Sequence, residues 1–138
     1  MSEMLTRNIP AITAETAEHW AGCARHELLI QRCLECRTYQ FYPRIMCTSC
    51  TGKSLQWARA SGRGLVKSFT IVRRAVSEAY AAEVPYVVAL VELEEGPTMM
   101  SNVVNTNVDE IRIGMPLEVV FDDWPEGVSI PKFQPRIV

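Results

Sequence analysis

Histidine is scarce in this sequence, since only His19 and His26 occur in 138 residues. Nucleophilic catalysis by a Cys–His or Ser–His pair would have to use one of these two side chains. They lie seven positions apart, which is too far along a helix for both to bind one metal ion. We therefore expect both histidines to be solvated or to cap a helix, and we expect no catalytic residues in this chain.

Long apolar runs and excess positive charge are also missing. The longest apolar run, residues 84–91, is far shorter than the roughly 20 residues that cross a bilayer. The chain begins Met-Ser-Glu without an apolar signal segment, so we expect a cytoplasmic protein in a reducing compartment, with no membrane partner. A net charge of −2 gives no general attraction for phosphate backbones, which argues against a nucleic-acid partner.

Four of the five cysteines stand in two CxxC pairs with ten residues between them. They are Cys33, Cys36, Cys47 and Cys50. Each pair can turn two thiolates toward one ion, and four sulfur ligands complete the tetrahedral shell of Zn²⁺ without a position for water. A reducing compartment disfavours two disulfides, whereas iron stays open as the bound metal. The pattern predicts a structural metal site, with Zn²⁺ as the expected ion.

The segment before these cysteines favours a helix that starts at Thr13, as its cap, and runs to about His26. A narrow apolar stripe at helical spacing consists of Ala17, Trp20, Ala21 and Ala24. Such a stripe usually packs on the protein's own core, and docking on a partner chain is the alternative. Cys23 has no partner at ligand spacing, so we expect it to be a small buried residue and not a nucleophile.

The gap between the CxxC pairs leaves room for one small hairpin. Residues 38–42 are rich in strand formers, Pro43 lies where the chain turns back, and residues 55–57 begin a return strand. A module of this size cannot bury enough surface to fold unaided. The metal must therefore supply much of its stability.

Strand signals dominate from Gly64 onward, with turn residues between the strands. The five expected strands cover residues 65–74, 86–93, 98–104, 117–122 and 127–133. A helical turn at 108–111, capped by Thr106, separates the third strand from the fourth. Five antiparallel strands with a short helix in that position predict a closed OB-fold barrel, and a plain β-sandwich is the alternative.

The predicted fold is therefore mainly β and has three parts. An N-terminal helical arm covers residues 1–29, and a rubredoxin-like zinc ribbon covers residues 30–57. A five-stranded OB-fold domain with a C-terminal tail covers residues 58–138.

Several short blocks follow one another along the chain in a distinctive order. They are Gln-Arg-Cys at 31–33 with Cys36, Phe-Tyr-Pro-Arg at 41–44, the second CxxC, Ser-Gly-Arg-Gly at 61–64, Lys-Ser-Phe-Thr at 67–70, and the segments 85–93 and 112–119. Together they resemble the acyl-CoA-associated zinc-ribbon/OB-fold proteins of domain-of-unknown-function family thirty-five, over roughly residues 13–133. This sequence departs from the family pattern at two positions. The family often has Phe at the position of His19 and often has Gly at the position of Arg37.

The resemblance implies an accessory subunit that forms a hetero-oligomer with a thiolase-fold catalytic subunit. Such complexes act on CoA thioesters as thiolases, acyltransferases or side-chain retro-aldolases, and the partner would supply the catalytic residues. This chain would stabilise the partner and help to bind CoA or acyl-CoA. The helix with Trp20 and the tail segment 131–135, both expected to offer apolar groups outside the barrel core, are the expected contacts with that partner.

The zinc hairpin is the expected contact with CoA in that complex. Phe41 and Tyr42 offer ring faces, and Arg44 follows a stiffening Pro43 with a guanidinium for phosphate. The alternative is that the two rings cover the metal site and that Arg44 pairs with a carboxylate.

Two functions from other classes stay open. A single-stranded nucleic-acid-binding module would use a basic groove, and basic residues do gather along the first barrel strand. They are Arg59, Arg63, Lys67, Arg73 and Arg74. A rubredoxin-like electron carrier would hold iron in the four cysteines, with Tyr39, Phe41 and Trp57 around it.

Overall fold

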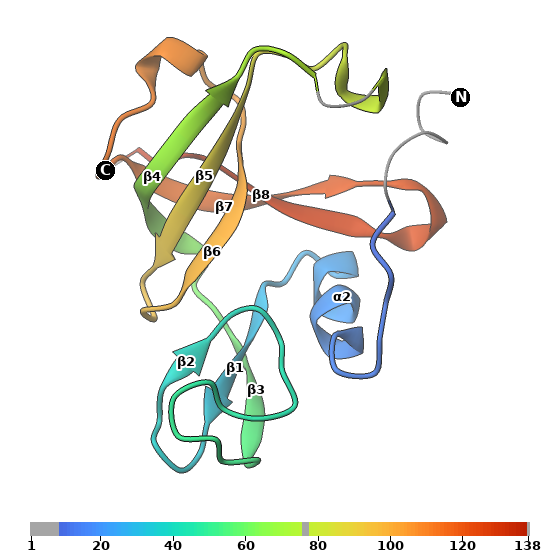
Figure 1. The fold of residues 1–138 in the computed structure, drawn as a ribbon, viewed down its shortest axis with the longest axis vertical. Coiled ribbons are helices and arrows are strands. Elements are labelled where there is room, and N and C mark those ends of the chain that lie inside the picture. Colours follow the sequence, from blue (N-terminus) through green and yellow to red (C-terminus); the bar gives the residue numbers. More distant parts are fainter. Residues whose placement is uncertain (1–8, 76–77, 138) are drawn as a thin grey trace.

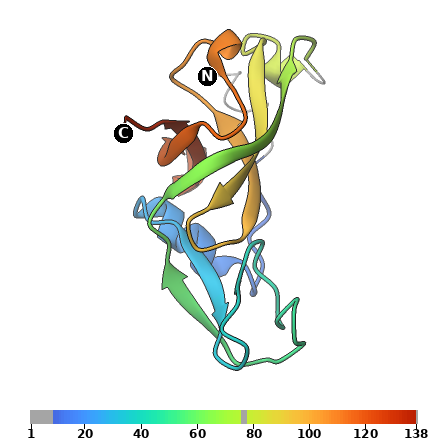
Figure 2. The same cartoon turned by 90° about the vertical axis from the view of Figure 1, so that its left-hand side faces the viewer.

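The computed structural model describes residues 9–75 and 78–137. Figure 1 shows two stacked parts, a five-stranded barrel and, below it, a three-stranded sheet with one helix beside it. The view turned by 90° shows the two parts end to end (Figure 2). The predicted mainly β fold with an N-terminal helix, a ribbon and a barrel is confirmed. No helix in the described residues has the length and apolar character needed to cross a membrane.

The ribbon sheet has the strand order β2-β1-β3, with both pairs antiparallel. Its strands are β1 (Leu29–Cys33), β2 (Tyr39–Gln40) and β3 (Leu55–Arg59). The return strand expected from residue 55 is confirmed, whereas the strand expected at 38–42 ends at Gln40. From Phe41 the chain leaves the sheet, because Pro43 cannot donate to a ladder and nearby amides bond to glutamine side chains instead.

The barrel closes in the order β4-β5-β6-β8-β7. Its strands are β4 (Arg63–Val72), β5 (Tyr86–Leu93), β6 (Thr98–Val103), β7 (Pro116–Asp123) and β8 (Ser129–Pro135). β6 pairs with β8 in parallel at Val103 and Phe133, and β4 pairs with β7 to complete the ring. This closed five-stranded barrel is an OB-fold, so the β-sandwich alternative is wrong.

The C-terminal segment 131–135 is not the apolar tail that the sequence suggested. It forms most of β8, and Phe133 is 0% exposed at the centre of the barrel core. Pro131 is also buried, and Lys132 between them points to the other side of the strand. The fifth strand expected at residues 127–133 is therefore confirmed with both ends two residues later, and only the apolar tail expected at 131–135 is wrong.

Helix α2 (Ala17–Ala24) begins later than predicted, with Thr16 at its N-cap. Thr13, the expected cap, lies in the preceding turn, where its N–H donates to Thr16 Oγ1 at 2.9 Å. The helix lies close to β1, since a Cβ atom on Gly22 would come within 2.7 Å of Leu29 Cγ. Only glycine permits this approach at that position.

The buried face of α2 is not the predicted alanine stripe. The buried residues on this side are Thr16, His19, Gly22 and Cys23. Ala17, Ala21 and Ala24 are exposed and Trp20 is half-buried. The prediction that this stripe packs on the protein's own core is therefore wrong. The expected burial of Cys23 is confirmed, whereas His19 is buried and not solvated.

Three 3₁₀ turns lie in the described parts of the barrel connections. They are η1 (Glu78–Tyr80), η2 (Val108–Glu110) and η3 (Pro125–Gly127). The turn expected between the third and fourth barrel strands is η2, but its cap is Asn107 and not Thr106. Asn107 Oδ1 accepts a hydrogen bond from the Asp109 N–H at 3.0 Å.

Candidate functional site: a four-cysteine cluster and an aromatic groove

The four cysteines of the CxxC pairs meet at the far end of the ribbon, with all their Sγ atoms within 4.8 Å of one another. Cys33 Sγ lies 3.6 Å from Cys50 Sγ, and Cys36 Sγ lies 3.5 Å from Cys47 Sγ. Four sulfurs at about 2.3 Å from one zinc ion would be about 3.8 Å apart. The cluster therefore fits a tetrahedral Zn²⁺ site with a closed shell.

The two CxxC turns are structural copies of each other. The carbonyl of Cys33 accepts from the Arg37 N–H at 2.8 Å, and that of Cys47 accepts from the Thr51 N–H at 3.0 Å. Arg37 and Thr51 both have φ near +64°, at 64° and 63°. This left-handed backbone conformation is the one that glycine adopts most readily.

Backbone amides surround the sulfurs. The N–H of Cys36 donates to Cys33 Sγ at 3.4 Å, and the N–H groups of Ser49 and Cys50 donate to Cys47 Sγ at 3.3 and 3.4 Å. Hydrogen bonding to the side chain and backbone of Thr38 lowers the pKa of Cys36 to about 6. The backbone hydrogen bond with Gly52 lowers the pKa of Cys50, but the neighbouring cysteine sulfurs outweigh it and raise that pKa to about 12. A cation among the four sulfurs would favour thiolates at all of them, the form that binds metal.

A buried glutamine pair that the sequence reasoning missed fixes the loop between the CxxC pairs. Gln31 and Gln40 face each other across β1 and β2, and Gln40 Nε2 donates to Gln31 Oε1 at 2.8 Å. Gln31 also accepts from the Arg44 N–H and donates to the Arg44 carbonyl, each at 2.8 Å. Gln40 Oε1 accepts from the Thr48 N–H at 2.9 Å. The loop that carries Phe41 and Arg44 is thus held by side chains of the sheet.

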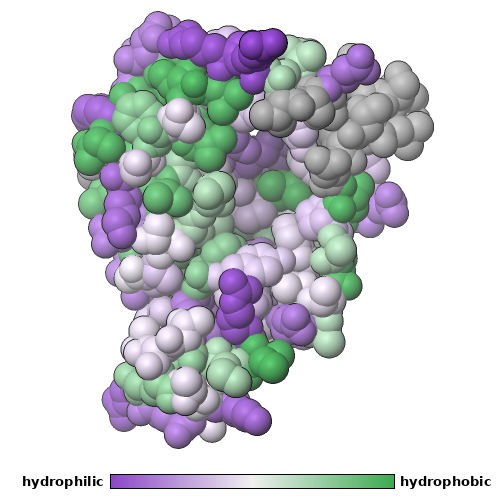
Figure 3. Space-filling view, in the orientation of Figure 1, coloured by the Kyte–Doolittle hydropathy of each residue, from purple (hydrophilic) through white to green (hydrophobic). Residues whose placement is uncertain are grey.

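A groove with a volume of about 740 Å³ lies between the ribbon, α2 and the barrel. Figure 3 shows this face of the molecule hollowed between the two parts. The ribbon and helix side is lined by Trp20, Phe41, Tyr42 and Arg44. The barrel side includes Tyr86, Val88, Met100, Trp124, Ile130 and Lys132.

The three residues expected to contact CoA all lie in this groove. Phe41 and Tyr42 pack edge to face against the His19 ring, at centroid distances of 5.3 and 6.0 Å. The Arg44 guanidinium lies over the Tyr42 ring at 5.7 Å, and Nη1 donates to the Pro43 carbonyl at 3.4 Å. In the described part of the chain Arg44 forms no ion pair with a carboxylate. Its exposed guanidinium can therefore accept an anionic group at the groove wall.

Both histidines are engaged in structural contacts. His19 Nδ1 lies 3.2 Å from the Leu29 carbonyl and Nε2 lies 3.7 Å from Cys23 Sγ, so Nδ1–H donates and Nε2 accepts. Burial lowers the pKa of His19 and raises the pKa of Cys23 to about 12, which keeps both neutral. His26 bonds to Asp123 Oδ1 at 2.8 Å and stacks on Phe121. Within the described part of the chain, neither ring is hydrogen-bonded to an exposed hydroxyl or thiol.

The basic residues along the first barrel strand are largely paired. Arg59 lies 3.8 Å from Glu27, Arg63 lies 4.0 Å from Glu94, and Arg73 lies 3.8 Å from Asp109. These carboxylates offset three of the five positive charges, whereas Lys67 and Arg74 form no ion pair among the described residues. The pairing reduces the cationic character that a nucleic-acid module would need.

Two family models match the chain, described as "ChsH2, rubredoxin-like zinc ribbon domain" over residues 20–56 and "ChsH2, C-terminal OB-fold domain" over residues 57–122. A "DUF35 domain-containing scaffold protein" of Methanothermobacter thermautotrophicus is 37% identical over 130 residues, covering 88% of this chain and 97% of the relative.

Two longer relatives are named as hydratase subunits. The "Probable enoyl-CoA hydratase alpha subunit" of Thermomonospora curvata is 35% identical over 93% of this chain. The "3-oxo-4,17-pregnadiene-20-carboxyl-CoA hydratase alpha subunit" of Mycobacterium tuberculosis is 32% identical over 85% of this chain. The matched region spans only 40% and 37% of these relatives' own lengths.

Solved structures give the same assignment of fold. A chain of the "Ltp2-ChsH2(DUF35) aldolase" matches 94% of this chain and 100% of its own length, with a TM-score of 0.83 and 33% identity. A DUF35-family protein of unknown function from Sulfolobus solfataricus matches 89% of this chain and 86% of its own, with a TM-score of 0.67 and 14% identity. This second match shows the fold alone.

Proposed function

The chain belongs to the DUF35 family of zinc-ribbon and OB-fold proteins, and we propose that it is a non-catalytic accessory subunit of a thiolase-fold complex that acts on CoA thioesters. The observation that carries the proposal is the match to a chain of the Ltp2-ChsH2(DUF35) aldolase over nearly the whole length of both. The hydratase alpha subunits and scaffold proteins among the relatives also support a role in an assembly with other chains.

The chemistry of the described residues supports an accessory role. Both histidines are occupied, and Cys23 is buried as a neutral thiol. The cysteine quartet is coordinatively closed once it holds zinc, so it supplies rigidity and no Lewis-acid site. We propose Cys33, Cys36, Cys47 and Cys50 as the ligands of one structural zinc ion, in a cytoplasmic protein whose reducing surroundings keep them as thiolates.

For CoA we propose that Arg44 contacts a phosphate group and that Phe41 and Tyr42 contact the adenosine. The exposed guanidinium at the groove wall, which has no carboxylate partner among the described residues, supports this role. A charge-assisted contact contributes about 1.5–3 kcal/mol. In the complex with its partner, Arg44→Ala should therefore raise the apparent KM for CoA esters about tenfold or more, and Lys53→Ala in the same ribbon should leave it unchanged. An unchanged KM in the Arg44 variant, with assembly intact, would place CoA on the partner alone.

The partner is identified by co-purification from the native host. We expect a thiolase-fold protein with its own nucleophile, turnover of CoA esters only in the complex, and none by the purified chain. Trp20→Ala should weaken assembly without loss of zinc, because the half-buried indole lies beside the exposed alanine face of α2. A partner without a thiolase fold would overturn the proposed reaction class but not the accessory role, and activity of the homogeneous chain alone would overturn both.

A further inference from the structure

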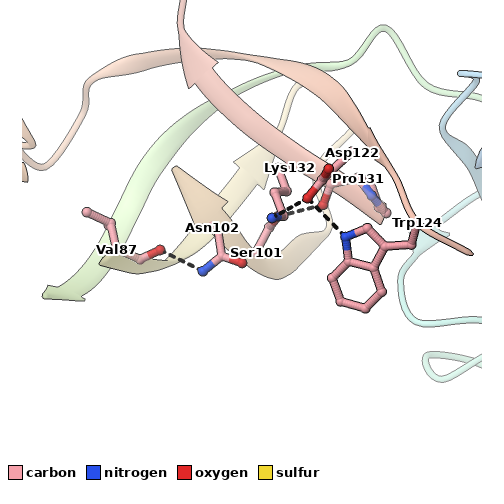
Figure 4. Close-up of polar contacts among 7 residues, drawn as sticks. All are labelled: Val87, Ser101, Asn102, Asp122, Trp124, Pro131 and Lys132. Carbon is pink, nitrogen blue, oxygen red and sulfur yellow. Dashed lines mark hydrogen bonds and ion pairs between the residues drawn. The ribbon is translucent and has the colours of Figure 1, made fainter. Parts of the chain in front are cut away.

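The two walls of the groove are held in place by different means. On the barrel wall the polar side chains are bonded to the barrel itself, as Figure 4 shows. Lys132 Nζ and Trp124 Nε1 both donate to Asp122 Oδ2, at 2.7 and 3.0 Å. Asn102 Nδ2 donates to the Val87 carbonyl at 2.9 Å. All of these residues belong to the barrel and its connections, so the contacts that fix this wall do not depend on the cysteine cluster.

The opposite wall depends on the cluster through the second CxxC turn. Thr48, which follows Cys47, donates to Gln40 Oε1 from its N–H at 2.9 Å and from its hydroxyl at 3.2 Å. Gln40 Nε2 in turn donates to the Met46 carbonyl at 3.3 Å and to the glutamine that holds Arg44. A displacement of Cys47 would therefore reach the loop that carries Arg44.

The four cysteines of the cluster differ in their access to solvent. Cys33 and Cys47 are buried, whereas Cys36 and Cys50 are exposed. Each exposed cysteine lies against a buried cysteine of the other CxxC pair. The sulfurs of Cys36 and Cys47 are 3.5 Å apart, and those of Cys33 and Cys50 are 3.6 Å apart. An exposed thiolate can react with a peroxide, and a second sulfur in contact with it can condense with the sulfenic acid that forms.

The two exposed sulfurs have different neighbours. Cys36 Sγ lies 3.3 Å from Thr38 Oγ1, whereas the matching position in the second turn is Gly52, which has no hydroxyl. A Cβ atom on Gly52 would contact the Glu35 carboxylate and lie 3.3 Å from Cys50 Sγ, so a carboxylate lies beside Cys50. When a thiolate attacks a peroxide, negative charge moves to the oxygen that leaves. The Thr38 hydroxyl can donate to this oxygen, whereas the Glu35 carboxylate would repel it, so Cys36 is the favoured site.

We propose that the cysteine cluster is a peroxide-sensitive switch in which Cys36 reacts first and Cys47 condenses with it. The Cys36 thiolate attacks one oxygen of hydrogen peroxide, the O–O bond breaks, and hydroxide leaves, which gives a sulfenic acid. The Cys47 thiolate then attacks the Cys36 sulfur, and a second hydroxide leaves as the disulfide forms. Two thiolates, one hydrogen peroxide and two protons thus become one disulfide and two waters.

The disulfide removes two of the four ligands from the metal and moves the CxxC turns. A disulfide holds its sulfurs about 2 Å apart, so Cys36 and Cys47 must approach each other by about 1.5 Å from their present 3.5 Å. Thr48 moves with Cys47 and disturbs the bonds to Gln40, so the loop of Arg44 loosens while the barrel wall stays in place. The inference rests on the proposed zinc site, and reduction by a dithiol in the presence of zinc restores the closed cluster.

The test exposes the zinc-loaded full-length chain to one equivalent of hydrogen peroxide. A chromogenic chelator measures zinc release, and mass spectrometry of peptides maps the disulfides. We expect one zinc released per disulfide, a link between Cys36 and Cys47, and faster amide exchange of residues 41–46. Dithiothreitol with added zinc should restore the zinc content. Cys23→Ser should behave as the unaltered chain, because Cys23 is buried and lies outside the cluster.

Thr38→Val tests which cysteine reacts first, and Thr70→Val, the same change at an exposed residue of β4, is its control. Loss of one hydrogen bond to the leaving oxygen should slow zinc release about fivefold in the Thr38 variant. The zinc content of the reduced variant should stay unchanged. Equal rates of release in the two variants would overturn the assignment of Cys36 as the first site.

The outcomes separate the switch from the proposed zinc site. A reduced chain that binds no zinc would overturn both. A chain that binds one zinc ion and keeps it in peroxide would overturn the switch alone. Disulfides confined to one CxxC pair, or oxidation that a dithiol does not reverse, would also overturn it. Zinc release with unchanged amide exchange of residues 41–46 would overturn the link between the cluster and the loop of Arg44.

Discussion

In the barrel, five strands close around a core of buried apolar side chains. Of the described residues in the three ribbon strands, only Ile30 belongs to this core. The polar interior of the ribbon consists instead of Gln31 and Gln40, both buried and bonded to each other. At the end of the ribbon, four sulfurs stand where a larger domain would place aliphatic groups. The two parts are therefore expected to respond to different perturbations.

This difference teaches that the ribbon is stable only while its polar contacts and its metal are complete. A hydrophobic core loses stability gradually when single groups are removed, because the remaining contacts stay in place. A closed metal site with few other contacts is lost as a unit when one ligand is removed. The predictions below test this contrast.

The largest effect is expected from Cys36→Ser. The variant should bind less than half an equivalent of zinc, where the unaltered chain binds one, and the residues between the CxxC pairs should lose amide protection because no apolar core replaces the metal. The barrel should keep its protection, although the unfolded ribbon should lower the solubility of the chain. Metal analysis and hydrogen exchange measure these outcomes. Ser49→Ala in the second CxxC turn is the control, and unfolding of the barrel together with the ribbon would break the comparison.

Next comes Phe133→Ala, which empties the centre of the barrel. Removing a fully buried phenylalanine typically costs about 3–5 kcal/mol, so the free energy of unfolding should fall by that amount. Zinc stoichiometry should stay at one below the new unfolding temperature, because the ligands do not contact this side chain. Denaturant unfolding checks the first outcome, with the exposed Ile113→Ala as control. Loss of zinc from a folded Phe133 variant would contradict separate sources of stability.

A smaller effect is expected from Gln31→Ala, which leaves the Arg44 amide and carbonyl and the Gln40 side chain without their partner. Unsatisfied buried groups cost about 1–3 kcal/mol. We expect a lower unfolding temperature and greater mobility of residues 41–44 in NMR relaxation. Gln56→Ala, exposed on β3, is the matched control. If both variants behave alike, the glutamine pair does not hold the loop.

The smallest effect concerns His26 and Asp123, which join the end of α2 to the β7–β8 hairpin. Hydrogen bonds from Ser129 and His26 lower the pKa of Asp123. A carboxyl group with a depressed folded-state pKa stabilises the fold above its unfolded pKa, and this contribution is lost as the pH falls below about 4. Asp123→Asn should therefore melt slightly earlier than the unaltered chain at pH 6, and the difference should vanish toward pH 3. A difference that grows on acidification would reverse the assigned sign.

The sequence predicted the features that depend on local patterns. Ligand spacing predicted the cysteine quartet, and strand signals predicted all five barrel strands within two residues at each end. The prediction failed where distant segments decide the outcome. Residues 131–135 lie in β8 and not in an apolar tail, and His19 is buried with its ring bonded to the Leu29 carbonyl, ten residues away. The groove could not be read from the sequence, since it is assembled from α2, the ribbon loop and the barrel.

Strand β1 connects the two ends of the molecule within five residues, with Ile30 in the shared core, Gln31 on the loop of Arg44, and Cys33 at the metal cluster. The binding of zinc is therefore thermodynamically linked to the binding of any ligand whose affinity depends on the order of the loop that carries Arg44. Reciprocity requires that the factor by which zinc tightens the ligand equals the factor by which the ligand tightens zinc. A chain loaded with thioester should accordingly need a higher chelator concentration to lose its metal at equilibrium than an empty one.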